Sequence, residues 1–234
     1  MNRIANTILL FTFFFLFTFP GKISAQLPAQ ILDSIKLSLH QKPSLNFGID
    51  SRNSFIGNGL ADILGAKLGV VFGNKFGIGL SGHLLNVDDS HFYKDYSVPA
   101  SGNSAEMVQA HLQLFYMAVY AEYIFHKSKY WKFSVPLQLG WGESNYLYTL
   151  NNQEKINNRH SILLCEPIFA SEYKINTWLS LTGEIGIRLM LLNNPAVMDN
   201  FNSPTFSIGL SVTYTQFCKQ FFPDSQLSRW LDKI

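Results

Sequence analysis

The clearest feature of the chain is an alternation of residue types. Between residues 64 and 85, large apolar side chains occupy every second position, and the positions between them are mostly glycine, small or polar. The alternation pauses at Gly73-Asn74-Lys75 and then restarts. A period of two is typical of β-strands, and two such runs around a turn predict a hairpin. Similar runs predict eight strands, at residues 44–52, 61–72, 76–85, 108–125, 131–142, 159–173, 179–191 and 205–214.

The predicted connections between these strands differ in length. Three are short turns, at 73–75, 126–130 and 174–177, whereas 86–107 and 143–158 are long polar loops. An even number of strands, with short turns on one side and long loops on the other, is typical of outer-membrane β-barrels. In such barrels the short turns face the periplasm and the long loops face the outside.

Aromatic residues lie beside the three short turns. They are Phe72, Phe76, Phe125, Tyr130, Trp131, Tyr173 and Trp178, and Tyr214 ends the last predicted strand at the same level. Amphipathic rings prefer the boundary between lipid and water, so this placement indicates an interfacial girdle.

The more polar face of the strands carries few charges and many glycines, serines and threonines. A soluble barrel of the lipocalin type would have the opposite arrangement, with an apolar interior and a charged exterior. Small side chains suit the crowded interior of an eight-stranded barrel. We therefore expect an all-β protein, a transmembrane eight-stranded antiparallel up-and-down β-barrel at residues 44–215, whose bulky apolar face contacts lipid. Closing the ring satisfies every backbone hydrogen-bonding group.

Composition supports a membrane protein. Charged residues make up 15% of the chain, against about 25% in soluble domains. Residues 1–25 are predicted to be a secretory signal peptide, because Arg3 precedes an apolar run at 8–19 and small residues at 23–25. The alternative, a single membrane anchor, needs about 20 apolar residues, and this run is shorter.

Cleavage after Ala25 would remove Arg3 and Lys22 and no acidic residue, which lowers the formal net charge from +2 to zero. A neutral chain gives no electrostatic reason to bind nucleic acid. We expect a leader at 26–43, with apolar residues at helical spacing, and a tail at 216–234, both in the periplasm.

A few charges fall on the face that would line the interior, the lumen, of the barrel. A buried charge is unfavourable unless it is paired, so we expect a polar network inside the barrel. Its predicted members are Lys67, Glu122, Glu166, Glu184 and Arg188.

The chain offers no motif for a metal or cofactor. Cys165 lies in a predicted strand and Cys218 follows the last one, so we expect two unpaired thiols. There is no CxxC, no HExxH and no zinc-like spacing of Cys and His. The prediction is therefore no metal and no cofactor.

Three segments resemble small outer-membrane β-barrel proteins of the Bacteroidetes type. They are LNFGIDSRNSFI at 45–56, ADILGAKLGVVFGNKFGIGLSGHLL at 61–85 and LTGEIGIRLML at 181–191. The resemblance implies an eight-stranded barrel in the outer membrane of a Gram-negative bacterium. It implies no catalytic residues. The chain departs from many such barrels because it continues about twenty residues past Tyr214.

The leading functional hypothesis is a structural or surface-interaction barrel that presents extracellular loops. Exposed loops on a rigid scaffold commonly carry binding functions, and the predicted contact residues are Tyr93, Tyr96, Tyr146 and Tyr148. The expected partners are outer-membrane lipid, the outer-membrane assembly machinery and an unidentified extracellular or periplasmic molecule, with the barrel itself a monomer.

Two alternatives stay open. One is an enzyme that modifies lipid A, in which Ser81 and His83 on one strand face would act with Glu166 or Glu184. The other is a narrow channel, although eight strands leave no aqueous pore once side chains fill the interior.

Overall fold

The structure is a computed structural model, and it describes residues 29–56, 59–85, 93–99, 105–150, 153–192 and 201–223. The chain divides into two units, Met1–Asp33 and Ser34–Ile234, and every strand belongs to the second. The predicted signal peptide lies outside the described residues.

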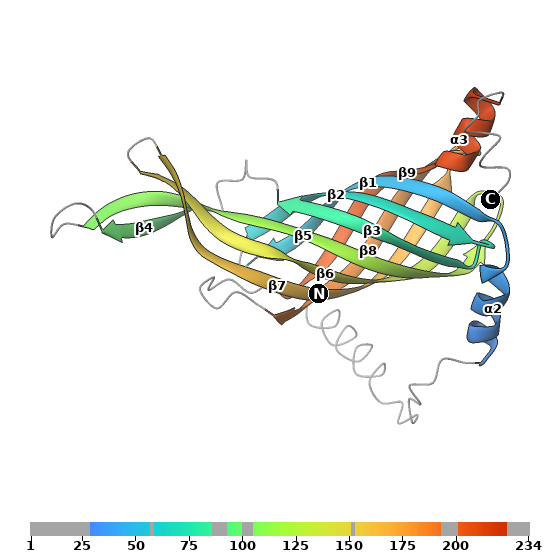
Figure 1. Ribbon diagram of the computed structural model, residues 1–234, viewed down its shortest axis with the longest axis horizontal. Helices are drawn as coiled ribbons and strands as arrows, with labels where there is room; N and C mark the ends of the chain where they lie inside the picture. Colours follow the sequence, from blue (N-terminus) through green and yellow to red (C-terminus); the bar gives the residue numbers. More distant parts are fainter. Residues whose placement is uncertain are drawn as a thin grey trace, which may run out of the picture. The chain divides into compact units, whose positions relative to one another are not determined.

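The second unit is built on nine described β-strands, shown in Figure 1. Eight of them form a closed ring in the order β1-β2-β3-β5-β6-β7-β8-β9, in which every neighbour is antiparallel. Pairing of β3 with β5 and of β1 with β9 completes the ring. The strands are β1 Pro43–Ile56, β2 Gly59–Phe72, β3 Phe76–Leu85, β4 Tyr93–Pro99, β5 Ala105–Lys127, β6 Trp131–Leu150, β7 Gln153–Lys174, β8 Leu179–Leu192 and β9 Ser203–Thr213. The predicted all-β, eight-stranded antiparallel ring is confirmed.

Side chains alternate between the outside and the inside of the ring, as the period of two requires. On β3, Leu80 is more than half exposed, whereas Ser81 and His83 are buried. Large apolar side chains occupy the outward positions of all eight ring strands; examples are Phe47, Leu68, Leu80, Val119, Leu139, Phe169, Ile185 and Ile208. The bulky face therefore lies outside the ring, as predicted.

The β2–β3 turn shows how local sequence fixes the hairpin. Gly73 and Asn74 both have positive φ, at 54° and 60°. Glycine and asparagine are the residues that tolerate this left-handed conformation best. The turn places Phe72 opposite Phe76, and the alternation on both strands follows from that register.

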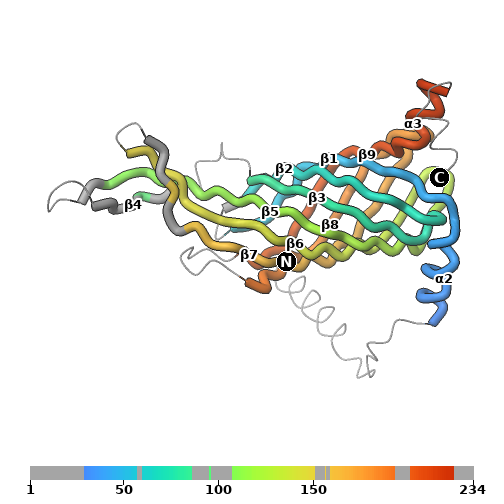
Figure 2. Tube along the Cα trace, in the orientation of Figure 1, coloured from blue at the N-terminus to red at the C-terminus, as the bar shows by residue number. Residues whose placement is uncertain are grey.

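Strands β5, β6 and β7 continue well beyond the ring. The pairing of β3 with β5 ends at Leu84 and Phe115, but β5 starts at Ala105 and continues to pair with β4 and β6. The four strands β4-β5-β6-β7 thus form a projecting sheet at the end of the ring away from the short turns, visible in Figure 1 and in the Cα trace of Figure 2.

The projecting sheet corrects the prediction of two long irregular loops. Residues 143–158 form the ends of β6 and β7, joined at 151–152, and 86–107 contains β4 and the start of β5. The prediction failed because polar residues were given more weight than the alternation that continues through Tyr146, Tyr148 and Leu150.

This arrangement also corrects the expected exposure of two tyrosines. Tyr146 and Tyr148 are only 2% and 8% exposed, because they fall on the inward face of β6. They are therefore packing residues and not exposed loop contacts. Tyr93 and Tyr96 belong to β4, but their side chains lie outside the described part of the structure. Their contact role stays a prediction.

A helix lies on each side of the barrel sequence. Helix α2 (Ala29–Leu39) lies in the predicted leader and ends before Pro43. Helix α3 (Tyr214–Phe221) directly follows β9, so Tyr214 starts a helix and does not end the last strand as predicted. None of the helices in the described residues is long and apolar enough to cross a membrane.

Substitutions at two glycines, one inward and one used as a control, test how tightly the interior is packed. Gly142 is buried opposite Tyr116, and a Cβ there would lie far inside contact distance of the Phe115 carbonyl oxygen. The substitution G142A should therefore lower the free energy of unfolding by about 1–3 kcal/mol. The matched variant G82A should change it little, because a Cβ at Gly82 meets no atom within 4 Å. Urea unfolding of both variants in one detergent measures this, and equal effects would contradict a crowded interior.

Candidate functional site in the barrel interior

The interior of the ring contains three layers of different chemistry. An apolar layer lies toward the projecting sheet, a layer of ion pairs occupies the middle, and a smaller charged cluster lies toward the short turns. We call the two ends of the ring the sheet end and the turn end. The chemistry of each layer is set by the residues that occupy the inward positions of the strands at that height.

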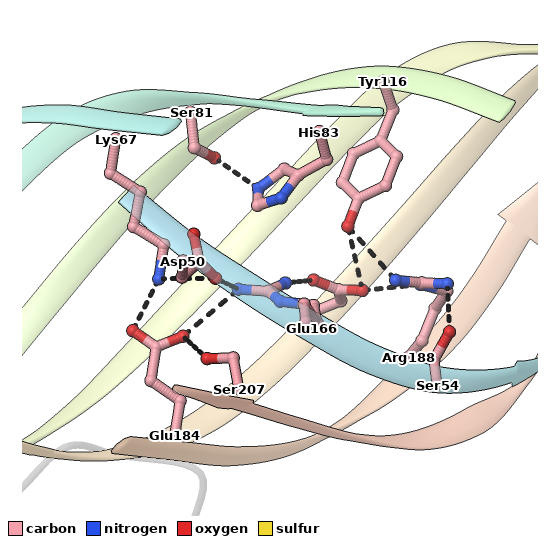
Figure 3. A network of polar contacts seen from close by, with 11 residues as sticks. Asp50, Ser54, Lys67, Ser81, His83, Tyr116, Glu166, Glu184, Arg188 and Ser207 are labelled. Carbon is pink, nitrogen blue, oxygen red and sulfur yellow. Dashed lines mark hydrogen bonds and ion pairs between the residues drawn. The ribbon is translucent and has the colours of Figure 1, made fainter. Parts of the chain in front are cut away.

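The middle layer is centred on Arg52 of β1 and Glu166 of β7, two strands that β8 and β9 separate in the ring. Figure 3 shows Glu166 in the network with Tyr116 and Arg188. Arg52 Nη1 donates a hydrogen bond to Glu166 Oε2. Arg188 Nε of β8 donates to the second oxygen of the same carboxylate at 2.6 Å. Arg188 and Glu166 are both fully buried, and two guanidinium groups share the Glu166 carboxylate, which is the pairing that a buried ionic group needs to be tolerated.

Hydroxyl groups complete the surroundings of Arg188. Its Nη1 donates to Ser54 Oγ and its Nη2 to Tyr116 Oη, both at 3.2 Å. The Tyr116 hydroxyl also lies 3.5 Å from Glu166 Oε1. The remaining hydrogen-bonding capacity of a buried ion pair must be satisfied for the pair to be tolerated, and these contacts do so.

Glu184 of β8 contacts Arg52 and adds a third cation, Lys67, to the layer. Lys67 Nζ of β2 donates to Glu184 Oε1 at 2.5 Å, and Arg52 Nη2 donates to Glu184 Oε2 at 3.1 Å. Asp50 lies 3.5 Å from Arg52 Nη2 and 3.8 Å from Lys67 Nζ. Ser207 Oγ donates to Glu184 Oε2 at 3.3 Å.

The middle layer is therefore balanced in charge. Its three cations and three carboxylates lie on β1, β2, β7 and β8, so the contacts reach across the interior of the ring; they are Arg52, Lys67, Arg188, Asp50, Glu166 and Glu184. We call these six residues the central ion-pair cluster. Its side chains lie across the interior of the ring at this height.

Room for the cluster comes from glycine. A Cβ at Gly65 would collide with Asp50 Oδ1 and would approach His83 Nδ1 to 2.8 Å. A Cβ at Gly209 would come within 2.8 Å of Asp50 Cβ. The inward glycines of β2 and β9 thus leave the space that the Asp50 and His83 side chains occupy.

The structure separates Glu122 from the other four predicted network residues. Glu122 lies 3.4 Å from Lys132 Nζ, and Lys132 Nζ also contacts Glu172 Oε2 at 2.6 Å. These three form the cluster nearer the turn end, whereas Lys67, Glu166, Glu184 and Arg188 all lie in the central cluster.

Sequence reasoning missed four members of the two clusters, Asp50, Arg52, Lys132 and Glu172. The signal for Arg52 was present, because it continues the inward series Asn46, Gly48 and Asp50 on β1. The signal for Lys132 was its position opposite Glu172 across the β6–β7 ladder.

The apolar layer was not predicted. It contains side chains from β1, β2, β3, β5, β6 and β7 together with Phe201; they are Ile56, Ala61, Ile63, Leu85, Ala110, Leu112, Leu114, Tyr116, Tyr146, Tyr148, Leu150, Ile162, Leu164 and Phe201. Since these residues are almost fully buried, the sheet end of the ring has an ordinary hydrophobic core that excludes water.

Ser81 and His83, the candidate catalytic pair, do contact one another. Ser81 Oγ lies 3.0 Å from His83 Nε2, and the imidazole stacks on Tyr116 with ring centroids 4.6 Å apart. Both side chains are buried, and the two predicted partner acids, Glu166 and Glu184, contact arginine or lysine instead. A lipid at the outer surface of the ring has no access to this pair. The described residues include no group of three or more His, Cys, Asp or Glu placed to hold a metal ion.

No protein family matches the chain, and no characterised protein matches it by sequence. Solved structures resemble it. Neisserial surface protein A has a TM-score of 0.49 at 11% identity, over 73% of this chain and 96% of that one. The attachment invasion locus protein Ail of Yersinia pestis has a TM-score of 0.44 at 12% identity, with the same coverage. The outer membrane protein OprG of Pseudomonas aeruginosa has a TM-score of 0.43 at 10% identity, over 74% and 96%.

The central cluster predicts a large difference between two Glu-to-Gln substitutions. E166Q leaves Arg52 and Arg188 without their shared carboxylate, and such a loss in a buried pair destabilises by about 3–5 kcal/mol. E143Q removes an ion pair with Arg159 whose side chains are 42% and 63% exposed, and the expected change is below about 1 kcal/mol. Urea unfolding in the same lipid measures both. Similar losses in the two variants would show that the cluster contributes no special stability.

Proposed function

We propose that this protein is an integral outer-membrane β-barrel with a closed lumen, which holds the projecting sheet outside the cell for interaction with another molecule. The observation that carries the proposal is the band of large apolar side chains on the outside of the ring. A band of this extent is far larger than the apolar patches of soluble monomers.

The height of the band supports a membrane location. On β6 the outward apolar positions run from Trp131 to Trp141, and the next outward residue, Glu143, is paired with Arg159 of β7. A strand that crosses the hydrocarbon layer at a tilt needs about 9–11 residues, which agrees with this span. Beyond Glu143 the strands continue as the projecting sheet.

Aromatic contacts at the turn end support the same placement. The rings of Trp131 and Tyr173 lie 5.0 Å apart, and those of Tyr130 and Tyr173 lie 6.5 Å apart. All three side chains are exposed; Trp131 and Tyr173 lie on the neighbouring strands β6 and β7, and Tyr130 lies in the turn before β6. Such rings favour the level of the lipid headgroups, so they mark the inner edge of the membrane.

The closed lumen favours a scaffold over a channel or an enzyme. The central ion-pair cluster and the apolar layer both block the interior, and Ser81 and His83 are enclosed between them. The projecting sheet, by contrast, extends the rigid strands well past the ring. Binding sites are commonly built on exposed parts that a rigid scaffold positions. The partner and the predicted monomeric state remain part of the proposal.

Two cysteine variants test the orientation that this function requires. Ile156 is exposed on the projecting sheet and Lys129 is exposed in the β5–β6 turn. In a background carrying C165S and C218S, a membrane-impermeant maleimide should label I156C on intact cells and K129C only after the cells are broken. Labelling is read on gels of the membrane fraction. If K129C reacts on intact cells while I156C is protected, the sheet faces the periplasm and the proposed function is wrong.

A further inference from the structure

A pocket of about 740 Å³ opens at the turn end of the ring. Its wall combines the ends of β5, β6 and β7 with Gln216 and Gln220 of α3. The hydrogen bond from Thr177 Oγ1 to Gln220 Oε1, at 3.1 Å, fixes the helix to the β7–β8 connection. The volume lies within the range of small-molecule sites, about 300–1,000 Å³.

Four lysines line this pocket, and Glu172 is the only acidic residue among its lining residues in the described structure. Lys132 is already engaged, because its ammonium contacts both Glu122 and Glu172. The other three lysines are Lys127, Lys129 and Lys174.

These three ammonium groups contact only neutral partners. Lys127 Nζ donates to Asn74 Oδ1, and Lys174 Nζ donates to the Ser128 carbonyl oxygen at 3.3 Å. Lys129 Nζ lies 5.1 Å from the centre of the Tyr130 ring. Within the part of the chain that the structure describes, no carboxylate lies within ion-pair distance of any of the three. The pocket therefore has an excess of positive charge.

The strand register shows that this excess of positive charge destabilises the fold when no anion is bound. Lys127 lies directly opposite Lys132 in the β5–β6 ladder, and like charges in opposed positions destabilise a sheet. Arrangements that weaken a fold are concentrated at functional sites. A bound anion would offset the repulsion.

The depth of the pocket limits where an anion can bind. Toward the interior it adjoins a smaller cavity whose wall includes Asp50, Glu122 and Glu184. These carboxylates are paired with Arg52, Lys67 and Lys132, so the smaller cavity has no excess of positive charge, and an anion would stay at the mouth beside the three lysines. The side-chain amide of Asn176 lines the same mouth, and its nitrogen can supply neutral hydrogen-bond donors.

We propose that the mouth of the barrel at the turn end is a binding site for a phosphate group, held by Lys127, Lys129 and Lys174. The phosphate belongs either to the headgroup of an anionic phospholipid or to a soluble molecule. Lysine ammonium groups bind phosphate as point charges from several directions, which suits three lysines on separate segments. The site goes beyond the proposed function and does not depend on which side of the membrane the mouth faces.

The test uses the full mature chain, folded in uncharged maltoside micelles at low ionic strength. Calorimetric titration with inorganic pyrophosphate and with dihexanoyl phosphatidylglycerol separates the two sources, since the tighter ligand identifies the source. Removing two cations in K127Q/K174Q should weaken binding of the tighter ligand at least about tenfold, the effect of losing charged hydrogen bonds. Raising the salt concentration should weaken binding to the unmodified chain.

The control variant K36Q/K75Q removes the same charge from positions that do not line the pocket, and it should bind like the unmodified chain. Heat-modifiable migration on gels shows whether each variant is folded. If K127Q/K174Q does not fold, K129Q, in an exposed turn, takes its place with a smaller expected loss. Absence of binding of both probes, or equal weakening in lysine and control variants, would overturn the proposed site.

Discussion

A closed ring of eight strands has room inside for little more than its own side chains. This limit determines the character of each strand. Every second residue must fit in the interior, and so the inward series combines glycines such as Gly65 and Gly142 with the few large side chains that the space admits. The outward series is free of that restriction, and large apolar residues occupy it. The period of two in the sequence arises because successive residues alternate between these two environments.

The small interior also explains the form of the central ion-pair cluster. Arg52, Glu166 and Arg188 are withdrawn from water, so each needs partners in the protein. The geometry supplies them from strands that are not neighbours in the ring, which ties β1 to β7 and β8 through the interior. The same contacts lie across the middle of the interior. The outer band, the projecting sheet and the pocket at the turn end are then the surfaces through which the protein meets its surroundings.

Alternation allowed the ring, the outward face and the inward placement of Lys67, Glu166, Glu184 and Arg188 to be predicted, because the side-chain direction in a strand depends only on parity. Whether a position is odd or even does not determine which inward side chains contact one another across the ring. That is why Glu122 was grouped with residues that it does not contact, and why Arg52 was missed although its parity was correct. The projecting sheet was missed because Tyr146 and Tyr148 alternate within a segment that is polar in composition, and composition was given precedence over the pattern.

Spin labels placed one at a time at residues 115–123 of β5, with the barrel in a lipid bilayer, test the central claim most directly. Oxygen is concentrated in the hydrocarbon layer, so its collision rate with each label reports contact with lipid. The account predicts high accessibility at the odd positions, such as Met117 and Val119, and low accessibility at the even positions, such as Ala118 and Tyr120. Maxima at the even positions, or accessibility without a period of two, would contradict the assignment of the apolar face to lipid.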